Sequence, residues 1–152
     1  MLAAAHADQL ESAAGAPGGV LVRWLATVID TALGLLASLL AAILFALAGL
    51  DAQTGVEAAI LLWFVVYPPL MIAFADGQTH GKRAMGIRAQ RAAGEPIGLG
   101  RAIARESILK LAFTLIPLGL VVDAIVARSD ERRRSIHDRV VGTRVVTVAR
   151  SR

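Results

Sequence analysis

Hydrophobic residues along the chain gather in three long runs, which polar and basic segments separate. The first run, 20–50, holds one charged residue after Arg23, the carboxylate of Asp30. At about 1.5 Å per residue this run forms a helix longer than the roughly 30 Å hydrocarbon core of a bilayer. The second run, 56–75, has the length of about 20 residues that one span needs. Two transmembrane helices are therefore expected.

Pro68 and Pro69 interrupt the second run. Proline lacks a backbone N–H and clashes with the preceding turn, so the pair is expected to bend the helix and free carbonyl groups one turn earlier. Such carbonyls either bind a cation or only shape the packing at the bend. In the acidic link 51–57, Thr54 or Gly55 is the candidate cap of the second helix.

The first helix has two unlike faces. At 100° per residue, one face is rich in Leu, Ile, Val and Phe, and the other is small and polar. Small residues let another helix approach closely, so the polar face is expected to pack against protein. This face carries Arg23, Thr27, Asp30, Gly34, Ala37, Ser38 and Ala41.

An ionisable group deep in a spanning helix costs about 2.5–3.5 kcal/mol and normally faces a partner or water. Asp30 is therefore either a packing residue hydrogen-bonded to another helix or a carboxylate that titrates or binds a cation. Side chains of a helix lean towards its N-terminus, so Arg23 is expected to lean away from Asp30.

The third run, 107–127, is long enough for a span but contains Lys110, Asp123 and a break at Pro117-Leu118-Gly119. It is either a plain third span or a re-entrant hairpin of two short arms. In the hairpin, Lys110 and Asp123 reach a similar depth and can pair. A continuous helix would hold them about 20 Å apart.

Both segments that flank the third run, 76–105 and 128–152, carry an excess of Lys and Arg. Short basic segments stay on the cytoplasmic side, whereas the link 51–57 is expected outside. A third run that does not cross satisfies both conditions, and it allows a strand at 84–91 to pair with one at 143–149. We predict an all-α membrane protein with two full transmembrane helices, a broken or re-entrant third segment and this small cytoplasmic β element.

The composition agrees with an integral membrane protein. Of 152 residues, 56 % are hydrophobic and 18 % charged, with a net charge of +4. Because the positive charge lies outside the apolar runs, anionic lipid headgroups are the expected partners and nucleic acid is not. The chain has no cysteine, and its three histidines lack metal-ligand spacing, so neither a metal nor another cofactor is predicted.

The basic segments contain two groups of residues with candidate chemistry. Ser135, His137 and Asp138 suggest a hydrolase, but they lack a nucleophile elbow and neighbours in sequence do not make a triad, so no enzymatic activity is expected. The glycine-rich stretch 77–86 lacks the phosphate-loop pattern. It is expected to form a tight turn with Lys82 and Arg83 near lipid phosphates. Residues 98–105 are expected to start an amphipathic helix along the membrane surface, with Arg101 and Arg105 one turn apart.

Three stretches together resemble the RDD family of membrane proteins. The stretch Arg23 to Asp30 resembles the family's opening Arg…Asp helix. Residues 77–88 resemble its Gly-Gln-Thr-x-Gly-Lys-Arg loop, and residues 134–146 resemble its closing His-Asp…Gly-Thr segment. The loop contributes Gly77, Gln78, Thr79, Gly81, Lys82 and Arg83, and the closing segment contributes His137, Gly142 and Thr143.

The family is named after one Arg and two Asp, which the resemblance places at Arg23, Asp30 and Asp138. Asp123 lies outside the family motifs. The resemblance covers a membrane domain at 20–149, preceded by a disordered tail at 1–19 and followed by a short tail at 150–152. His137-Asp138 is expected to orient Arg23 or the basic loop through a cytoplasmic salt-bridge network.

Transport of ions or small ligands has been proposed for the family, and two hypotheses follow for this chain. In the first, Asp30 takes up H⁺, Na⁺ or a small ligand, with Thr27, Lys110 and Asp123 as an intramembrane polar network. Two or three helices do not enclose a path, so a homo-oligomer or larger complex is expected, with the Gly34/Ser38 side between protomers.

In the second hypothesis, the chain is a non-transporting scaffold or assembly protein whose basic segments bind anionic lipid or a partner. For either one we expect an integral protein of the bacterial plasma membrane. The N-terminus and the segments 76–105 and 128–152 are then cytoplasmic.

Overall fold

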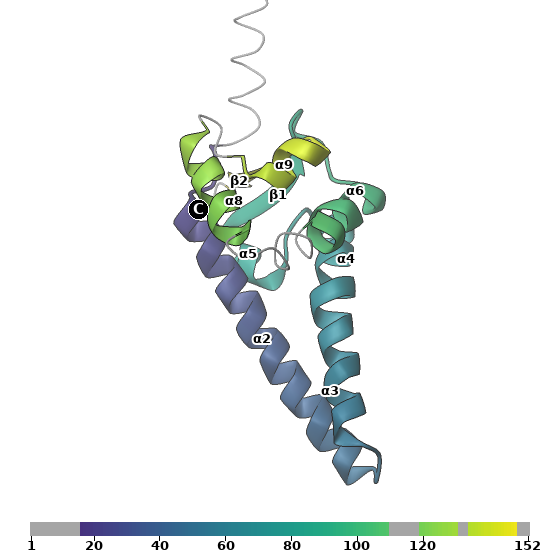
Figure 1. The fold of residues 1–152 in the computed structure, drawn as a ribbon. Helices are drawn as coiled ribbons and strands as arrows, with labels where there is room; N and C mark the ends of the chain where they lie inside the picture. The colour runs from purple at the N-terminus through teal and green to yellow at the C-terminus, as the bar shows by residue number, and fades with distance from the viewer. Residues whose placement is uncertain (1–15, 110–118, 131–133, 149–152) are drawn as a thin grey trace, which may run out of the picture.

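A computed structural model describes residues 16–109, 119–130 and 134–148. Its two longest helical stretches form a hairpin, closed at one tip and spread apart at the other end (Figure 1). One arm is α2 (Val20–Leu47), and the other runs through α3 (Ala52–Leu61), the π-helical η1 (Leu62–Val66) and α4 (Tyr67–Phe74).

The remaining elements gather at the open end of the hairpin (Figure 1). They are α5 (His80–Ala84), β1 (Ile87–Arg91), α6 (Leu99–Ile103), η2 (Ala104–Leu109), α8 (Gly119–Ser129), α9 (Ile136–Val141) and β2 (Thr143–Thr147). We call residues 76–107 and 134–148 together the cap.

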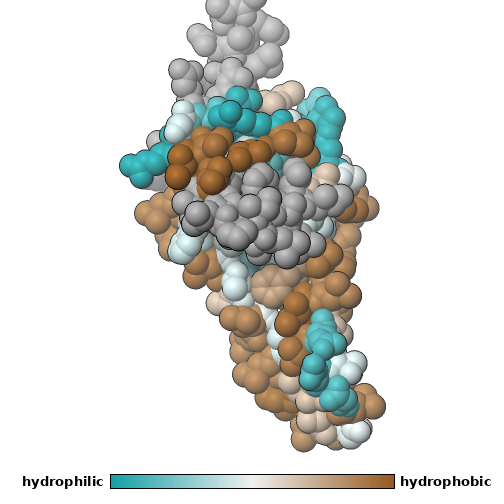
Figure 2. Space-filling model, in the orientation of Figure 1, coloured by the Kyte–Doolittle hydropathy of each residue, from teal (hydrophilic) through white to brown (hydrophobic). Residues whose placement is uncertain are grey.

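Both arms are long and apolar enough to cross a membrane. Their 28 and 23 residues correspond to about 42 and 35 Å of helix. Large hydrophobic side chains cover their outer faces, among them Leu36, Leu44 and Leu62, and are exposed. Figure 2 shows this apolar surface along the arms, with hydrophilic residues at the cap and at the tip. An exposed apolar surface of this extent is typical of a face that contacts a membrane or another protein.

The ends of the two arms differ from the prediction. The first helix stops at Leu47, and Gly49 turns the chain with a φ of 71°. The second begins at Ala52 because the Asp51 carboxylate accepts hydrogen bonds from the Thr54 N–H and hydroxyl, both at 2.8 Å. The prediction of Thr54 or Gly55 as the cap was therefore wrong: Asp51 caps this helix.

The small and polar face of α2 packs against protein, as predicted: Gly34 and Ser38 are buried. The partner is the second arm of the same chain, since a Cβ on Gly34 would lie 2.3 Å from the Trp63 ring. The expectation that the Gly34/Ser38 side lies between protomers was therefore wrong. The indole of Trp63 already occupies that surface.

The second arm changes its helical pitch before its two prolines. The Tyr67 N–H bonds to the Leu62 carbonyl, a π-helical step of five residues. Pro69 has no N–H to offer the Val65 carbonyl, and the Ser107 hydroxyl donates to that carbonyl instead, at 2.9 Å. This freed carbonyl is thus used to fasten η2 to the bend.

Strands β1 and β2 pair antiparallel, with Ile87 opposite Thr147 and Arg91 opposite Thr143. This confirms the predicted strand pairing, although both strands are shorter than expected. Residue 84 still belongs to α5, and Gly86 turns the chain with a φ of 64° before β1 begins. Beneath the sheet, a small core contains Ile72, Ile87, Ile97, Ala102 and Val145.

Part of the segment predicted as an N-terminal tail joins this sheet. The Gly18 N–H bonds to the Val145 carbonyl and the Thr147 N–H to the Ala16 carbonyl, both at 2.9 Å. The sheet therefore brings the start of α2, the segment after the second arm and the segment after the third run to one end of the hairpin. Lys110 and the side chain of Asp123 lie outside the described residues.

Candidate functional site

The glycine-rich loop before β1 is pressed against its neighbours at two points. Gly77 has a φ of 72°, and a Cβ there would lie 1.8 Å from the Ala89 carbonyl oxygen. A Cβ on Gly81 would lie 2.0 Å from the Ala26 carbonyl oxygen of α2. Gln78 donates to the Ile87 carbonyl at 3.0 Å. The glycines thus allow the loop to reach α2 and β1, in the tight turn that the sequence predicts.

The loop binds the carboxylate of Asp30. The Thr79 hydroxyl donates to Oδ2 at 2.6 Å, and the Gly81 N–H donates to Oδ1 at 2.8 Å. Thr79 also accepts from the Lys82 N–H and so caps α5. Within the described residues, none of the ion pairs includes Asp30, so its partners are neutral donors.

A cavity of about 380 Å³ lies beside Asp30, between α2, the bend of the second arm, α5 and η2. Its walls are largely apolar, with Ala26, Phe64 and Pro68 among them. Besides the aromatic residues Trp63 and Tyr67, the residues with polar side chains that line it are Thr27, Asp30, Thr31, Thr79, Lys82, Glu106 and Ser107. Of the intramembrane network predicted from the sequence, Thr27 and Asp30 therefore meet at one cavity, and the Thr27 hydroxyl donates to the Arg23 carbonyl.

An aromatic column connects this cavity to the cap. Trp63 donates from Nε1 to the Asp30 carbonyl oxygen at 2.8 Å and stacks on Tyr67, with ring centroids 4.4 Å apart. The Tyr67 hydroxyl lies 2.6 Å from Nδ1 of His80, which is exposed. The sequence analysis missed these residues. The four-residue spacing of Trp63 and Tyr67, which places them on one helix face, was the available signal.

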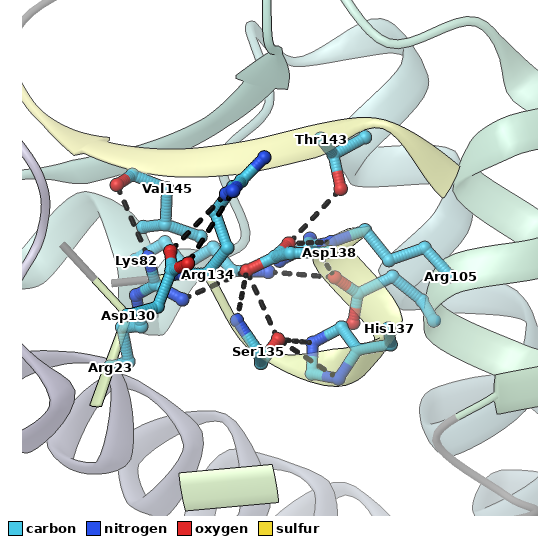
Figure 3. A network of polar contacts seen from close by, with 11 residues as sticks. Arg23, Lys82, Arg105, Asp130, Arg134, Ser135, His137, Asp138, Thr143 and Val145 are labelled. Atoms are coloured by element: carbon cyan, nitrogen blue, oxygen red, sulfur yellow. Dashed lines mark hydrogen bonds and ion pairs between the residues drawn. The ribbon is translucent and has the colours of Figure 1, made fainter. Parts of the chain in front are cut away.

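A second site lies in the cap, where Asp138 is fully buried. Arg23 donates to its Oδ2 at 2.9 Å, and Arg105 donates to its Oδ1 at 3.0 Å (Figure 3). The hydroxyls of Ser135 and Thr143 add hydrogen bonds at 3.1 and 3.0 Å. Burial raises the pKa of Asp138, but the positive charges of Arg105 and Arg23 outweigh it and hold the pKa well below its usual range.

The ion pairs continue from Asp138 to the cavity. Arg105 also binds Glu106, and Lys82 donates to the same Glu106 oxygen at 3.0 Å. Lys82 was expected near lipid phosphates, and Arg105 in a helix along the membrane surface. The structure turns both inwards because the buried carboxylates Glu106 and Asp138 require compensating charge. Arg83, beside them, is exposed.

The closing segment holds Asp138 in place through helix capping. Ser135 and Asp138 form a capping box at the start of α9, and Gly142 ends this helix with a φ of 66°. The His137 ring lies 3.0 Å from the Ser135 hydroxyl. Thr143, the first residue of β2, points its hydroxyl at the same carboxylate. Among the described residues, the Ser135 hydroxyl thus takes part in the cap of α9, where it also bonds to Asp138.

Two apolar arms and a cap of buried ion pairs define a small integral membrane protein. The sequence profile of the RDD family matches residues 17–142, and the chain belongs to this family. This confirms the resemblance noted in the sequence. An uncharacterized protein of Haemophilus influenzae is 34 % identical over 128 residues, which cover 82 % of this chain and 74 % of that protein. No solved structure matches the chain.

Proposed function

We propose that the chain is a membrane subunit that takes up H⁺ or Na⁺ at Asp30 and moves it across the bilayer. One observation carries this proposal: the Asp30 carboxylate lines a largely apolar cavity and is bound by two neutral donors. Burial disfavours an ionised carboxylate unless a positive charge is near it. A proton or a small cation that enters the cavity supplies that charge.

The cap faces the cytoplasm of a bacterial plasma membrane in this proposal. The support is the position of the basic segments, which the pairing of β1 with β2 and of Arg23 with Asp138 holds at one end of the hairpin. With both segments on one side, the third run enters the membrane and returns. Exposed basic residues such as Arg83 and Arg101 then lie near anionic headgroups.

Transport also requires more than one copy or a larger complex, because two spanning arms do not enclose a path. The Gly34/Ser38 side is used within the chain, so the contacts between copies fall on the outer, apolar faces of the arms. Contacts between helices in a membrane depend on packing rather than on hydrophobic burial.

A second candidate function is a scaffold or assembly protein without transport or enzymatic activity. The specific observation in its favour is that both oxygens of Asp30 fasten the loop to α2. In this role the Asp30 carboxylate is needed for folding, and the exposed basic residues bind anionic lipid or a protein partner.

The test is H⁺ and Na⁺ flux in vesicles that contain the purified protein. Asp30→Asn keeps the side-chain shape and one acceptor oxygen but removes the charge. We expect flux in the wild type and loss of flux in a folded Asp30→Asn variant. Asp51→Asn, at the exposed tip, is the matched control. Equal flux in wild type and Asp30→Asn refutes transport at Asp30. No wild-type flux, with an unfolded Asp30→Asn variant, supports the scaffold.

A further inference from the structure

His80 lies at the solvent-exposed end of the aromatic column, and Tyr67 lies in its middle. Two hydrogen bonds join these residues: Nδ1 of His80 is 2.6 Å from the Tyr67 oxygen, and the His80 backbone N–H donates to the same oxygen at 2.8 Å. Their rings are also stacked, with centroids 5.7 Å apart. The His80 imidazole is thus held against the Tyr67 phenol both by hydrogen bonds and by ring stacking.

Trp63 also holds Tyr67 in position, because the two rings are stacked. Trp63 bonds to the backbone of Asp30, and its ring fills the space left by the missing side chain of Gly34. Because Tyr67 stacks on Trp63, its side chain is held at the wall of the cavity that Asp30 lines. Tyr67 and Asp30 therefore face one shared cavity.

We propose that His80 and Tyr67 form a proton relay between the aqueous side of the cap and the Asp30 carboxylate. The relay rests on the proposed uptake of H⁺ at Asp30 and adds the route by which the proton arrives. Histidine suits the outer position because one ring nitrogen of the imidazole can accept a proton while the other releases one.

The transfer conserves protons at each step. Water delivers a proton to Nε2 of a neutral His80, whose Nδ1 then carries its own proton. The Nδ1–H bond breaks as an O–H bond forms on Tyr67, while the original O–H bond of Tyr67 breaks and its proton binds a carboxylate oxygen of Asp30. His80 returns to its neutral form, and tautomer exchange through solvent restores the starting state. No oxidant or co-reactant is needed.

Other charged groups face this line of residues. Lys82 and Glu106 line the same cavity and neutralise each other as an ion pair at 3.0 Å. Arg83, which follows Lys82 on α5, is exposed to solvent. Since Lys82 and Glu106 are paired, Asp30 is the group beside Tyr67 that is left to accept a proton.

The relay is tested by the rate at which Asp30 gains a proton after a pH drop on the cap side. The carboxyl C=O infrared band, assigned through its loss in Asp30→Asn, reports this event in the full chain in lipid. Tyr67→Phe keeps the ring stacking but removes the hydroxyl, and we expect it to slow protonation by about 100-fold, as for loss of a positioned proton-transfer group. We expect His80→Ala to slow it similarly and added imidazole to restore the rate.

Imidazole rescue separates a relay from a structural role, because free imidazole supplies proton transfer but no packing. Ser129→Ala, which removes a hydroxyl bonded to the Ile125 carbonyl of α8, is a matched control with an expected wild-type rate. An unchanged rate in Tyr67→Phe, with the Asp30 band present, overturns the relay and leaves uptake at Asp30 standing. The absence of a titrating Asp30 band in the wild type overturns both.

Discussion

The substitution Asp138→Asn removes one charge from the centre of the cap and keeps the shape of the side chain. Asp138 has no exposed surface, and its two basic partners, Arg23 and Arg105, have side chains that are 16 % and 3 % exposed. Breaking a buried ion pair from one side costs about 3–5 kcal/mol, because the remaining charge stays buried without compensation. A typical domain has only about 5–15 kcal/mol of stability, so the cap is expected to loosen markedly.

The assay is reversible unfolding in mixed micelles, combined with amide hydrogen exchange of β2. We expect a lower free energy of unfolding and faster exchange at Val145, which lies next to the site. The matched control is Asp130→Asn. Asp130 binds Arg134 and Arg139, whose side chains are 31 % and 46 % exposed, so this loss is expected to stay below about 1 kcal/mol. Equal effects of the two substitutions would refute the reasoning.

Acid titration gives an independent measure of the same site. Because the folded state holds the pKa of Asp138 below its unfolded value, the unfolded chain binds the proton first as the pH falls. The stabilisation is complete above the unfolded value of about 3.9 and is lost progressively below it. Wild-type stability should therefore fall more steeply with acid than that of Asp138→Asn. Parallel curves below pH 4 would contradict the assignment.

Substitutions at three further positions test the contacts around Asp30 and the bend. Gly81→Ala places a Cβ 2.0 Å from the Ala26 carbonyl oxygen, so the loop should leave α2, which faster exchange of the residue 81 N–H would reveal; protection equal to wild type contradicts this. Ser107→Ala leaves the Val65 carbonyl without its donor and should lower stability by about 1 kcal/mol in micelle unfolding. Thr79→Val should destabilise the loop and Thr79→Ser should not, because only the hydroxyl binds Asp30; equal unfolding midpoints would exclude this role.

The two spanning arms, the strand β2 and the close packing of α2 could be predicted from the sequence. The apolar runs give two spanning arms because a bilayer imposes a minimum length on a helix. The β-branched stretch at 143–149 predicts a strand, and β2 forms within it. The small face of α2 predicts close packing, but small residues serve equally within one chain or between chains. The choice of Trp63 as the partner depends on the folded structure.

The charged sites were only partly predictable, because their partners lie far apart in the sequence. Arg23 and Asp138 are separated by 115 residues, and only the family resemblance linked them. Arg105 was expected at the membrane surface because helical periodicity does not distinguish lipid headgroups from a buried carboxylate of the same chain. Its partner Asp138 follows 33 residues later, so no local pattern joins them.

The hydroxyl of Ser107 attaches the beginning of the third apolar run to the bend of the second arm. It holds the Val65 carbonyl at the π-helical turn, and the third apolar run starts at this same serine. Straightening or deepening the bend therefore pulls directly on the beginning of that run. A tilt of the part of the second arm before this bend therefore reaches the start of the third run through this hydrogen bond and through the packing of η1 and α4 against η2, without passing through the sheet.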